Sequence, residues 1–276
     1  MRFALCNEVL APLGFAEQCA AAAKLGYDGL EVAPFTLAED PTTITDGQAE
    51  QFRRMADDAG LAICGLHWLL VAPAGLSIVS EDAALRARTV GVMKRLAELC
   101  AALGGSYLVH GSPKQRSVPQ GSTKEAALAR ATDCFAQIAP VAASLGLVYC
   151  VEPLSTRETD LVNSVAEAVR IVDHVNSPGL RTMIDCSAAG QVEMDSVADL
   201  IRRWIPSGHV AHVQANDPNR RAPGQGEMDF EPILRALRDV DYRGIVAVEP
   251  FDYVPDGPGC AAFAIDYLLG IERSLA

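Results

Sequence analysis

The chain has 276 residues, half of them apolar, which is enough to build a large hydrophobic core. Its 35 acidic and 23 basic residues give a formal net charge of −12. This balance argues against a nucleic-acid partner, because gripping a phosphate backbone requires clustered Lys and Arg. It does not exclude a small anionic substrate, since a local pocket can oppose the charge of the whole protein.

Short apolar or β-branched runs recur along the chain and predict eight strands. They are Phe3–Cys6, Gly29–Val32, Ala62–His67, Tyr107–His110, Leu147–Glu152, Thr182–Asp185, Val210–Gln214 and Ile245–Glu249. Longer stretches with helical spacing separate these runs, as in 85–103. Capping-box patterns at Ser122–Glu125 and Ser164–Glu167 mark two helix starts. Several expected helices end at a glycine, which supplies a left-handed C-terminal cap: Gly26, Gly60, Gly104 and Gly146.

This alternation predicts a parallel sheet with helical crossovers, and eight units favour closure into a (β/α)₈ TIM barrel over an open sheet. A dinucleotide-binding fold is disfavoured because no G-x-G-x-x-G follows the first strand. Barrels of about 250 residues commonly form one domain, so we expect a single domain over residues 1–276.

The eight cysteines are scattered without a C-x-x-C pair, mostly within apolar runs, which favours small buried thiols in a reduced, cytoplasmic compartment. The N-terminal residues lack the pattern of a signal peptide. No apolar stretch approaches the roughly 20 residues that span a bilayer. We therefore expect a soluble protein without a membrane partner.

Polar residues stand at the ends of nearly all the predicted strands, where a strand buried on both faces should be apolar. They are Glu31, His67, His110, Glu152, Asp185, Gln214 and Glu249. The carboxyl ends of barrel strands meet on one face, the usual place for catalysis. Any one of these side chains has an ordinary structural explanation. Seven together predict a functional site, because charges gathered in a low-dielectric mouth need a cation or substrate to offset them.

Four of these residues come from successive strands and predict one metal site: Glu152, Asp185, Gln214 and Glu249. Three carboxylates and an amide oxygen form a hard donor set, which suits Mn²⁺ or Mg²⁺ best. Co²⁺, Zn²⁺ and Ni²⁺ stay open as alternatives.

At these residues the sequence resembles the xylose isomerase-like superfamily of sugar phosphate isomerases and epimerases, essentially end to end. The motifs are Val151–Leu154 with 157–163, Met183–Asp185, His212–Asp217, Asn219–Gly226 and Val248–Phe251. The resemblance implies one divalent cation held by the four ligands above. It also implies that Glu152 and Glu249 act as the acid/base pair. Gln at the third ligand position is similar to the hydroxypyruvate isomerase branch, whereas ketose 3-epimerases usually have His there.

The implied reaction is isomerisation or epimerisation of a small sugar or keto-sugar through a cis-enediolate. The cation polarises the carbonyl, while one glutamate removes the proton α to it and the other returns a proton. By the same resemblance, Arg220 contacts substrate oxygens, and Glu158 orders its loop and touches the sugar or Glu152. His67 and His110 are expected to line the pocket, with direct substrate contact left open.

Other residues carry narrower expectations. Trp68, in the apolar stretch 68–79, suits stacking on a sugar face, and a dimer contact is the competing explanation for that stretch. Lys114 and Arg116 could receive a substrate carboxylate or phosphate, although an exposed loop with ordinary surface charges is preferred. His212 is expected to point away from Gln214 and to be structural.

One position departs from the family pattern. Many relatives have His three residues after the strand-6 aspartate, where this chain has Ala188. Substrate orientation must therefore differ from that of a standard ketose 3-epimerase.

Three rival functions would use the same kind of barrel. A metal-dependent keto-sugar or inosose dehydratase or lyase would use the same ligands and is the main alternative. An endonuclease IV-like activity requires a His-rich zinc set that is missing here. A non-catalytic sugar-binding barrel does not explain why two glutamates suited to an acid/base pair are present. Substrate identity and oligomeric state, homodimer or homotetramer, stay open.

Overall fold

The computed structural model describes residues 1–275 and shows a closed barrel of eight parallel strands in the order β1 to β8. The strands are β1 (Arg2–Cys6), β2 (Gly29–Val32), β3 (Ala62–Leu66), β4 (Tyr107–His110), β5 (Val148–Val151), β6 (Leu180–Asp185), β7 (Val210–Ala215) and β8 (Ile245–Val248). Every predicted strand is present: the bounds of β2 and β4 match the prediction, and those of the other strands differ from it by at most two residues. The TIM-barrel prediction is confirmed.

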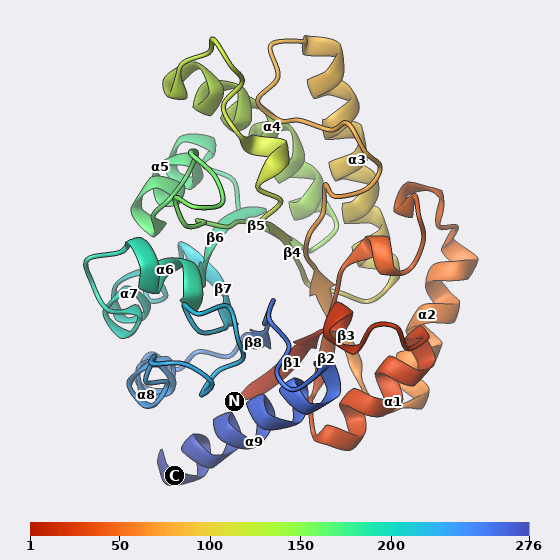
Figure 1. Cartoon of the computed structure of the whole chain (residues 1–276). Coiled ribbons are helices and arrows are strands. Elements are labelled where there is room, and N and C mark those ends of the chain that lie inside the picture. Colours follow the sequence, from red (N-terminus) through yellow and green to blue (C-terminus); the bar gives the residue numbers. More distant parts are fainter. Residues whose placement is uncertain (276) are drawn as a thin grey trace.

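Helices surround the strands on the outside (Figure 1). They are α1 (Phe15–Leu25), α2 (Asp46–Asp58), α3 (Ala83–Ala102), α4 (Lys124–Ser144), α5 (Val165–Val175), α6 (Cys186–Val192), α7 (Val197–Trp204), α8 (Glu231–Asp239) and α9 (Gly257–Leu275). Short 3₁₀ turns are η1 (Asn7–Leu10), η2 (Pro34–Thr36), η3 (Pro41–Thr43) and η4 (Lys114–Arg116). None of the helices in the described chain has the length and apolar character to cross a membrane.

The helix-end predictions hold with one shift. Gly26, Gly60, Gly104 and Gly146 all have positive φ angles of 70–95°. Ser164 caps α5 by accepting from the backbone N–H of Glu167. The predicted cap at Ser122 is wrong by one residue, because the neighbouring Thr123 accepts from Ala126 N–H and α4 begins at Lys124. Two adjacent hydroxyl residues offered equivalent caps, and the sequence pattern did not separate them.

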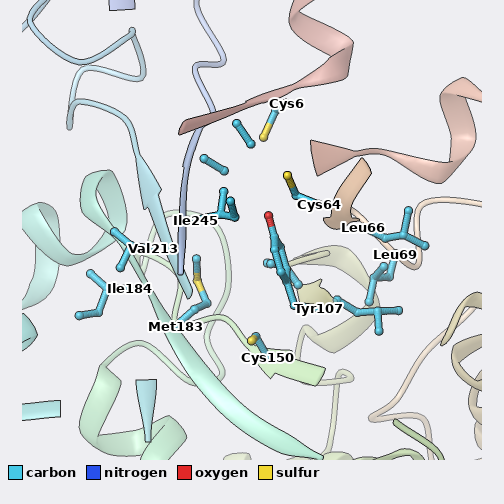
Figure 2. Close-up of a cluster of buried hydrophobic side chains, with 14 of the residues drawn as sticks. Cys6, Cys64, Leu66, Leu69, Tyr107, Cys150, Met183, Ile184, Val213 and Ile245 are labelled. Carbon is cyan, nitrogen blue, oxygen red and sulfur yellow. The ribbon is translucent and has the colours of Figure 1, made fainter. Parts of the chain in front are cut away.

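The barrel interior contains polar as well as apolar side chains. Figure 2 shows the ring of Tyr107 among Cys150, Met183 and Cys64, with its hydroxyl group directed toward the side of Cys6. Gly65 of β3 makes room for this ring, since a Cβ there would lie 2.5 Å from a Tyr107 ring carbon. All eight cysteines are buried and unpaired, in line with their predicted role as small apolar side chains.

Register places the candidate ligands at one end of the barrel. Asp185 pairs with Gln214, and Gln214 pairs with Ala247, two residues before Glu249. The register shifts between Leu30 and Glu31 in β2 and between Thr182 and Met183 in β6. Such irregularities re-aim the side chains that follow them, here Glu31 and Asp185.

Candidate metal centre at the barrel mouth

The four predicted ligands lie at the carboxyl ends of β5 to β8, and all are buried. One carboxylate oxygen from each of Glu152, Asp185 and Glu249 lies within 4.8 Å of the others. Gln214 Oε1 and Glu249 Oε2 are buried and have no hydrogen-bond partner. Buried acceptors without donors are rare in folded proteins. The donor set therefore fits a divalent cation that prefers oxygen ligands.

The three carboxyl groups are electrostatically strained as they stand. Burial raises the pKa of Asp185 to about 7 and that of Glu249 to about 8. Burial, followed by repulsion from Glu249 and Asp185, raises the pKa of Glu152 well above its ordinary value. A bound cation would favour the ionised form of all three, because an opposite charge at ligand distance offsets both burial and mutual repulsion.

Neighbouring groups position two of the carboxylates. Asp185 caps α6 by accepting from Ala188 N–H at 2.6 Å, and its other oxygen accepts from Asn216 Nδ2 at 2.7 Å. Glu152 packs against Gly111, where a Cβ would lie 1.8 Å from Glu152 Oε2. Ala188 itself offers only a backbone donor, so the family histidine has no side-chain substitute at this position.

His67 lies between two carboxylates. Its Nδ1 is 2.9 Å from Glu249 Oε1, and its Nε2 is 3.0 Å from Glu8 Oε2. Burial opposes protonation, but Glu8 and the hydrogen bonds to both carboxylates outweigh it and raise the pKa of His67 well above its usual value. Because both ring nitrogens are occupied by carboxylates, the structure gives His67 a role in holding Glu249.

Glu31 lies deeper in the barrel. Its Oε2 accepts from the Tyr107 hydroxyl at 2.6 Å and is 2.8 Å from His212 Nε2, while its Oε1 accepts from Gln214 Nε2 at 2.6 Å. Burial alone would raise the pKa of Glu31, yet His212, His67 and Tyr107 lower it to about 2.

The prediction for the orientation of His212 is wrong. His212 and Gln214 are two residues apart in β7 and so share a face of the strand, and both meet Glu31. The imidazole also stacks on the ring of Tyr107, with centroids 4.1 Å apart.

His110 lies away from the mouth. Its Nδ1 is 2.7 Å from the Tyr149 hydroxyl, and its ring packs edge-on against Phe135 of α4. Burial, with a contribution from Arg116, lowers the pKa of His110 to about 3. The expectation that His110 lines the pocket therefore fails, because the side chain faces the outer helices.

The two loop cations differ from each other. Lys114 is exposed, as preferred in the surface-loop interpretation. Arg116 contradicts that interpretation, since it is 1% exposed and donates from Nη1 to the carbonyl oxygen of Glu152 at 2.6 Å. Burial lowers the pKa of Arg116 to about 10. It supports the backbone of a candidate ligand from within the protein.

Two small cavities that share several lining residues border the carboxylates. One, of about 110 Å³, is lined by Glu152, Glu158, Asp185, Arg220 and Phe251, among others. The other, of about 20 Å³, lies between Trp68, Gly111, Glu152, Glu249 and Phe251. A larger cavity of about 560 Å³ lies at the opposite end, beside Arg2 and Tyr242, where strands begin. Barrel enzymes perform chemistry at the strand C-termini, so the two small cavities, and not the larger one, are the candidate substrate space.

Phe251 lines both small cavities, and no role was predicted for it from the sequence. The Arg220 guanidinium lies 4.6 Å from the centre of its ring, and Trp68 meets it edge-on at 6.2 Å. Arg220 is also 3.8 Å from Glu158. Both Arg220 and Trp68 have positive φ angles, 71° and 52°, which are strained for residues with side chains. The mouth thus brings Arg220 and Trp68, two residues predicted to contact the substrate, against the aromatic ring of Phe251.

Other supporting residues were also missed. Glu8, Asn216 and Gly111 each contact a candidate ligand or its partner. Asn216 stands two residues after Gln214 at the end of β7, a spacing that signals the same face. Glu8 and Gly111 carry no comparable pattern, because their contacts depend on loops that only the folded chain brings together.

The fold is a closed parallel barrel with a buried acidic cluster at the carboxyl ends of its strands, the face on which barrel enzymes carry their active sites. The chain belongs to the xylose isomerase-like TIM barrel family, whose model matches residues 19–269. It is 33% identical over 237 residues to a D-psicose 3-epimerase of Agrobacterium fabrum, covering 83% of this chain and 76% of that protein.

Further comparisons agree. A crystal structure of D-psicose 3-epimerase in the presence of D-fructose matches with a TM-score of 0.81 at 25% identity, covering 97% of this chain and 98% of the other. A D-psicose 3-epimerase with D-tagatose from Clostridium cellulolyticum H10 superposes with a TM-score of 0.84 at 21% identity, covering 98% and 99% of the two chains. The second likeness concerns the fold alone.

Proposed function

We propose that this protein is a divalent-metal-dependent epimerase or isomerase of a small sugar or keto-sugar. The observation that carries the proposal is the pair of buried glutamates, Glu152 and Glu249, which border the same small space. Their carboxylates come from β5 and β8, so they can reach a bound substrate from different directions. Similarity to D-psicose 3-epimerases supports this choice of reaction class.

Glu152, Asp185, Gln214 and Glu249 would hold the cation, with Mn²⁺ or Mg²⁺ preferred and Co²⁺, Zn²⁺ or Ni²⁺ as alternatives. The unpartnered oxygens of Gln214 and Glu249 support this assignment. When bound, the cation supplies Lewis acidity that polarises a substrate carbonyl and stabilises an enediolate.

The remaining chemistry belongs to the protein. One glutamate accepts the proton from the carbon next to the carbonyl, and the other returns a proton to the carbon skeleton. His67 holds Glu249 through Nδ1, and Gly111 leaves room for Glu152. Arg220 and Glu158 flank the substrate, while Trp68 and Phe251 provide an apolar wall that limits water.

Solvent-deuterium incorporation tests the proposal. The protein is incubated with Mn²⁺ in D₂O and a panel of ketoses, keto-acids and phosphorylated sugars, and products are followed by NMR and mass spectrometry. We expect deuterium at one carbon and an isomer that differs in mass only by that deuterium. A new enone absorbance would instead identify a dehydratase or lyase.

Glu249→Gln separates catalysis from binding. We expect exchange to fall by about 10²–10⁴-fold, the range for a lost general acid or base, while the fold is kept. Glu227→Gln is the matched control, since Glu227 is exposed in the loop between β7 and α8. If Glu249→Gln turns over at the wild-type rate with metal bound, the two-glutamate mechanism is wrong.

A further inference from the structure

In the side-chain amide of Gln214, the NH₂ group makes a hydrogen bond and the carbonyl oxygen does not. Its Nε2 donates to Glu31 Oε1 at 2.6 Å, whereas its Oε1 is buried without any partner. An amide can rotate by half a turn and exchange these two ends. Only one orientation presents an oxygen to a cation, so some group must select it.

We propose that Glu31 is the positioning residue that makes Gln214 a metal ligand, by holding its NH₂ group and leaving its carbonyl oxygen free to bind the cation. This inference rests on the proposed metal site. The inference adds a residue of β2, in the N-terminal half of the chain, to a site whose ligands all come from β5 to β8.

The surroundings of Glu31 support this role because its close contacts supply hydrogens. The Tyr107 hydroxyl donates to Oε2 at 2.6 Å, and the Cys6 thiol approaches Oε1 at 3.7 Å. His212 Nε2 lies 2.8 Å from Oε2. A carboxylate is an acceptor, so it satisfies the hydroxyl, the thiol and the amide NH₂ of Gln214, while His212 Nε2 lies close to it without a hydrogen bond. If Gln214 were rotated, two oxygens would face each other at 2.6 Å with no hydrogen between them.

Glu31 is also held in place. It is 0% exposed, and the stacked rings of Tyr107 and His212 fix both contacts to Oε2. Tyr107 in turn occupies space that Gly65 leaves open. The carboxylate therefore cannot turn away to release the amide without disturbing the packed interior.

The arrangement has an electronic consequence as well. Gln214 is a neutral ligand, but the carboxylate behind it polarises the amide and makes its oxygen a stronger donor. Carboxylates play the same part behind metal-bound histidines, where they fix orientation and raise basicity. Glu31 and Gln214 thus act together as one ligand unit.

The test measures Mn²⁺ affinity by calorimetry, with electron paramagnetic resonance of bound Mn²⁺ as the spectroscopic readout. In Glu31→Gln, residue 31 gains an NH₂ group and no longer selects the orientation of Gln214. We expect Mn²⁺ affinity to fall by about 10–100-fold, the usual effect of losing a group that supports a ligand. Glu227→Gln is the control, because it makes the same chemical change at an exposed residue of the loop between β7 and α8; its affinity should stay close to wild type.

The swap Glu31→Gln/Gln214→Glu gives an independent measurement. Its NH₂ group at position 31 can donate to a carboxylate at position 214, so affinity should recover most of what Glu31→Gln loses, as coupled residues do in a double-mutant cycle. If Glu31→Gln does not fold, the Mn²⁺ affinity of the swap decides the matter. Wild-type affinity in Glu31→Gln, or a folded swap that does not bind Mn²⁺, overturns the inference. Failure of the wild-type protein to bind Mn²⁺ would instead overturn the proposed metal site.

Discussion

Gly111 leaves the space that the carboxylate of Glu152 occupies. The substitution Gly111→Ala tests how strongly activity and metal binding depend on the position of that carboxylate. An added Cβ would lie 1.8 Å from Glu152 Oε2 and 2.9 Å from its Cδ. Gly111 is not among the glycines with positive φ, so alanine introduces no backbone strain there. The three atoms nearest to the added Cβ all belong to the carboxyl group of Glu152, so the substitution acts first on that group.

These contacts set how far the carboxylate must move. Because Cβ contacts under 3.0 Å essentially never occur, the carboxylate must retreat by about 1.2 Å. A shift of about 1 Å in a reacting group costs on the order of 10²-fold in rate. We expect a loss of that size in solvent-deuterium exchange and weaker Mn²⁺ binding. Overpacking should lower the free energy of unfolding by no more than about 1–3 kcal/mol.

Deuterium exchange, Mn²⁺ calorimetry and urea unfolding measure the three effects. Gly91→Ala is the matched control, since Gly91 lies within α3 and an added Cβ there meets nothing within 4 Å. It should leave exchange and Mn²⁺ binding unchanged and raise the unfolding free energy by up to about 1 kcal/mol. A Gly111→Ala variant with wild-type exchange and metal affinity would refute the assignment of Glu152 as ligand and proton carrier.

Two further predictions concern acidity and strain. Burial raises the pKa of Asp185 to about 7 and that of Glu249 to about 8, so the metal-free folded protein binds more protons than the unfolded chain between about pH 4 and 8. Its unfolding free energy should therefore fall as pH rises through that window, while the stabilisation that Mn²⁺ provides should grow. Thermal unfolding in EDTA and in Mn²⁺ measures both effects. If the increase in melting temperature caused by Mn²⁺ does not depend on pH, the proposed metal site is contradicted. Arg220 has φ 71°, so Arg220→Gly should be more stable to urea than Arg220→Ala by about 1–2 kcal/mol, although both lose the guanidinium and with it substrate affinity. Equal stability of the two variants would remove the argument for strain.

The residues at the strand ends could be predicted to meet, because their position along each strand determines which end of the barrel they reach. Asp185 and Gln214 stand within the last two residues of β6 and β7, and parallel strands bring such positions to one face. The period-two alternation of a strand also predicts that His212 shares the face of Gln214, so the prediction that His212 points away from Gln214 was wrong. Tyr107 faces the barrel interior, so His110, three residues later, faces the helices.

The supporting contacts were not predictable in the same way, because they join residues far apart in the chain. His67 holds Glu249 from 182 positions away, and Glu31 holds Gln214 from 183. Arg116 reads as a surface residue because its loop contains Gly, Ser and Pro, yet the fold buries it against Glu152. Sequence patterns indicate which residues reach the mouth, while tertiary packing decides what stands behind them.

The acidic groups of the barrel fall into two layers with opposite behaviour. Glu31, although buried, has its pKa lowered to about 2, since His212, His67 and Tyr107 outweigh burial. Asp185 and Glu249, nearer the mouth, have raised pKa values because burial dominates there. Glu31 is therefore ionised across the whole range in which the outer carboxyls exchange protons for a cation. Metal binding should depend on pH through the outer layer, while the inner layer keeps Gln214 oriented at every pH in that range.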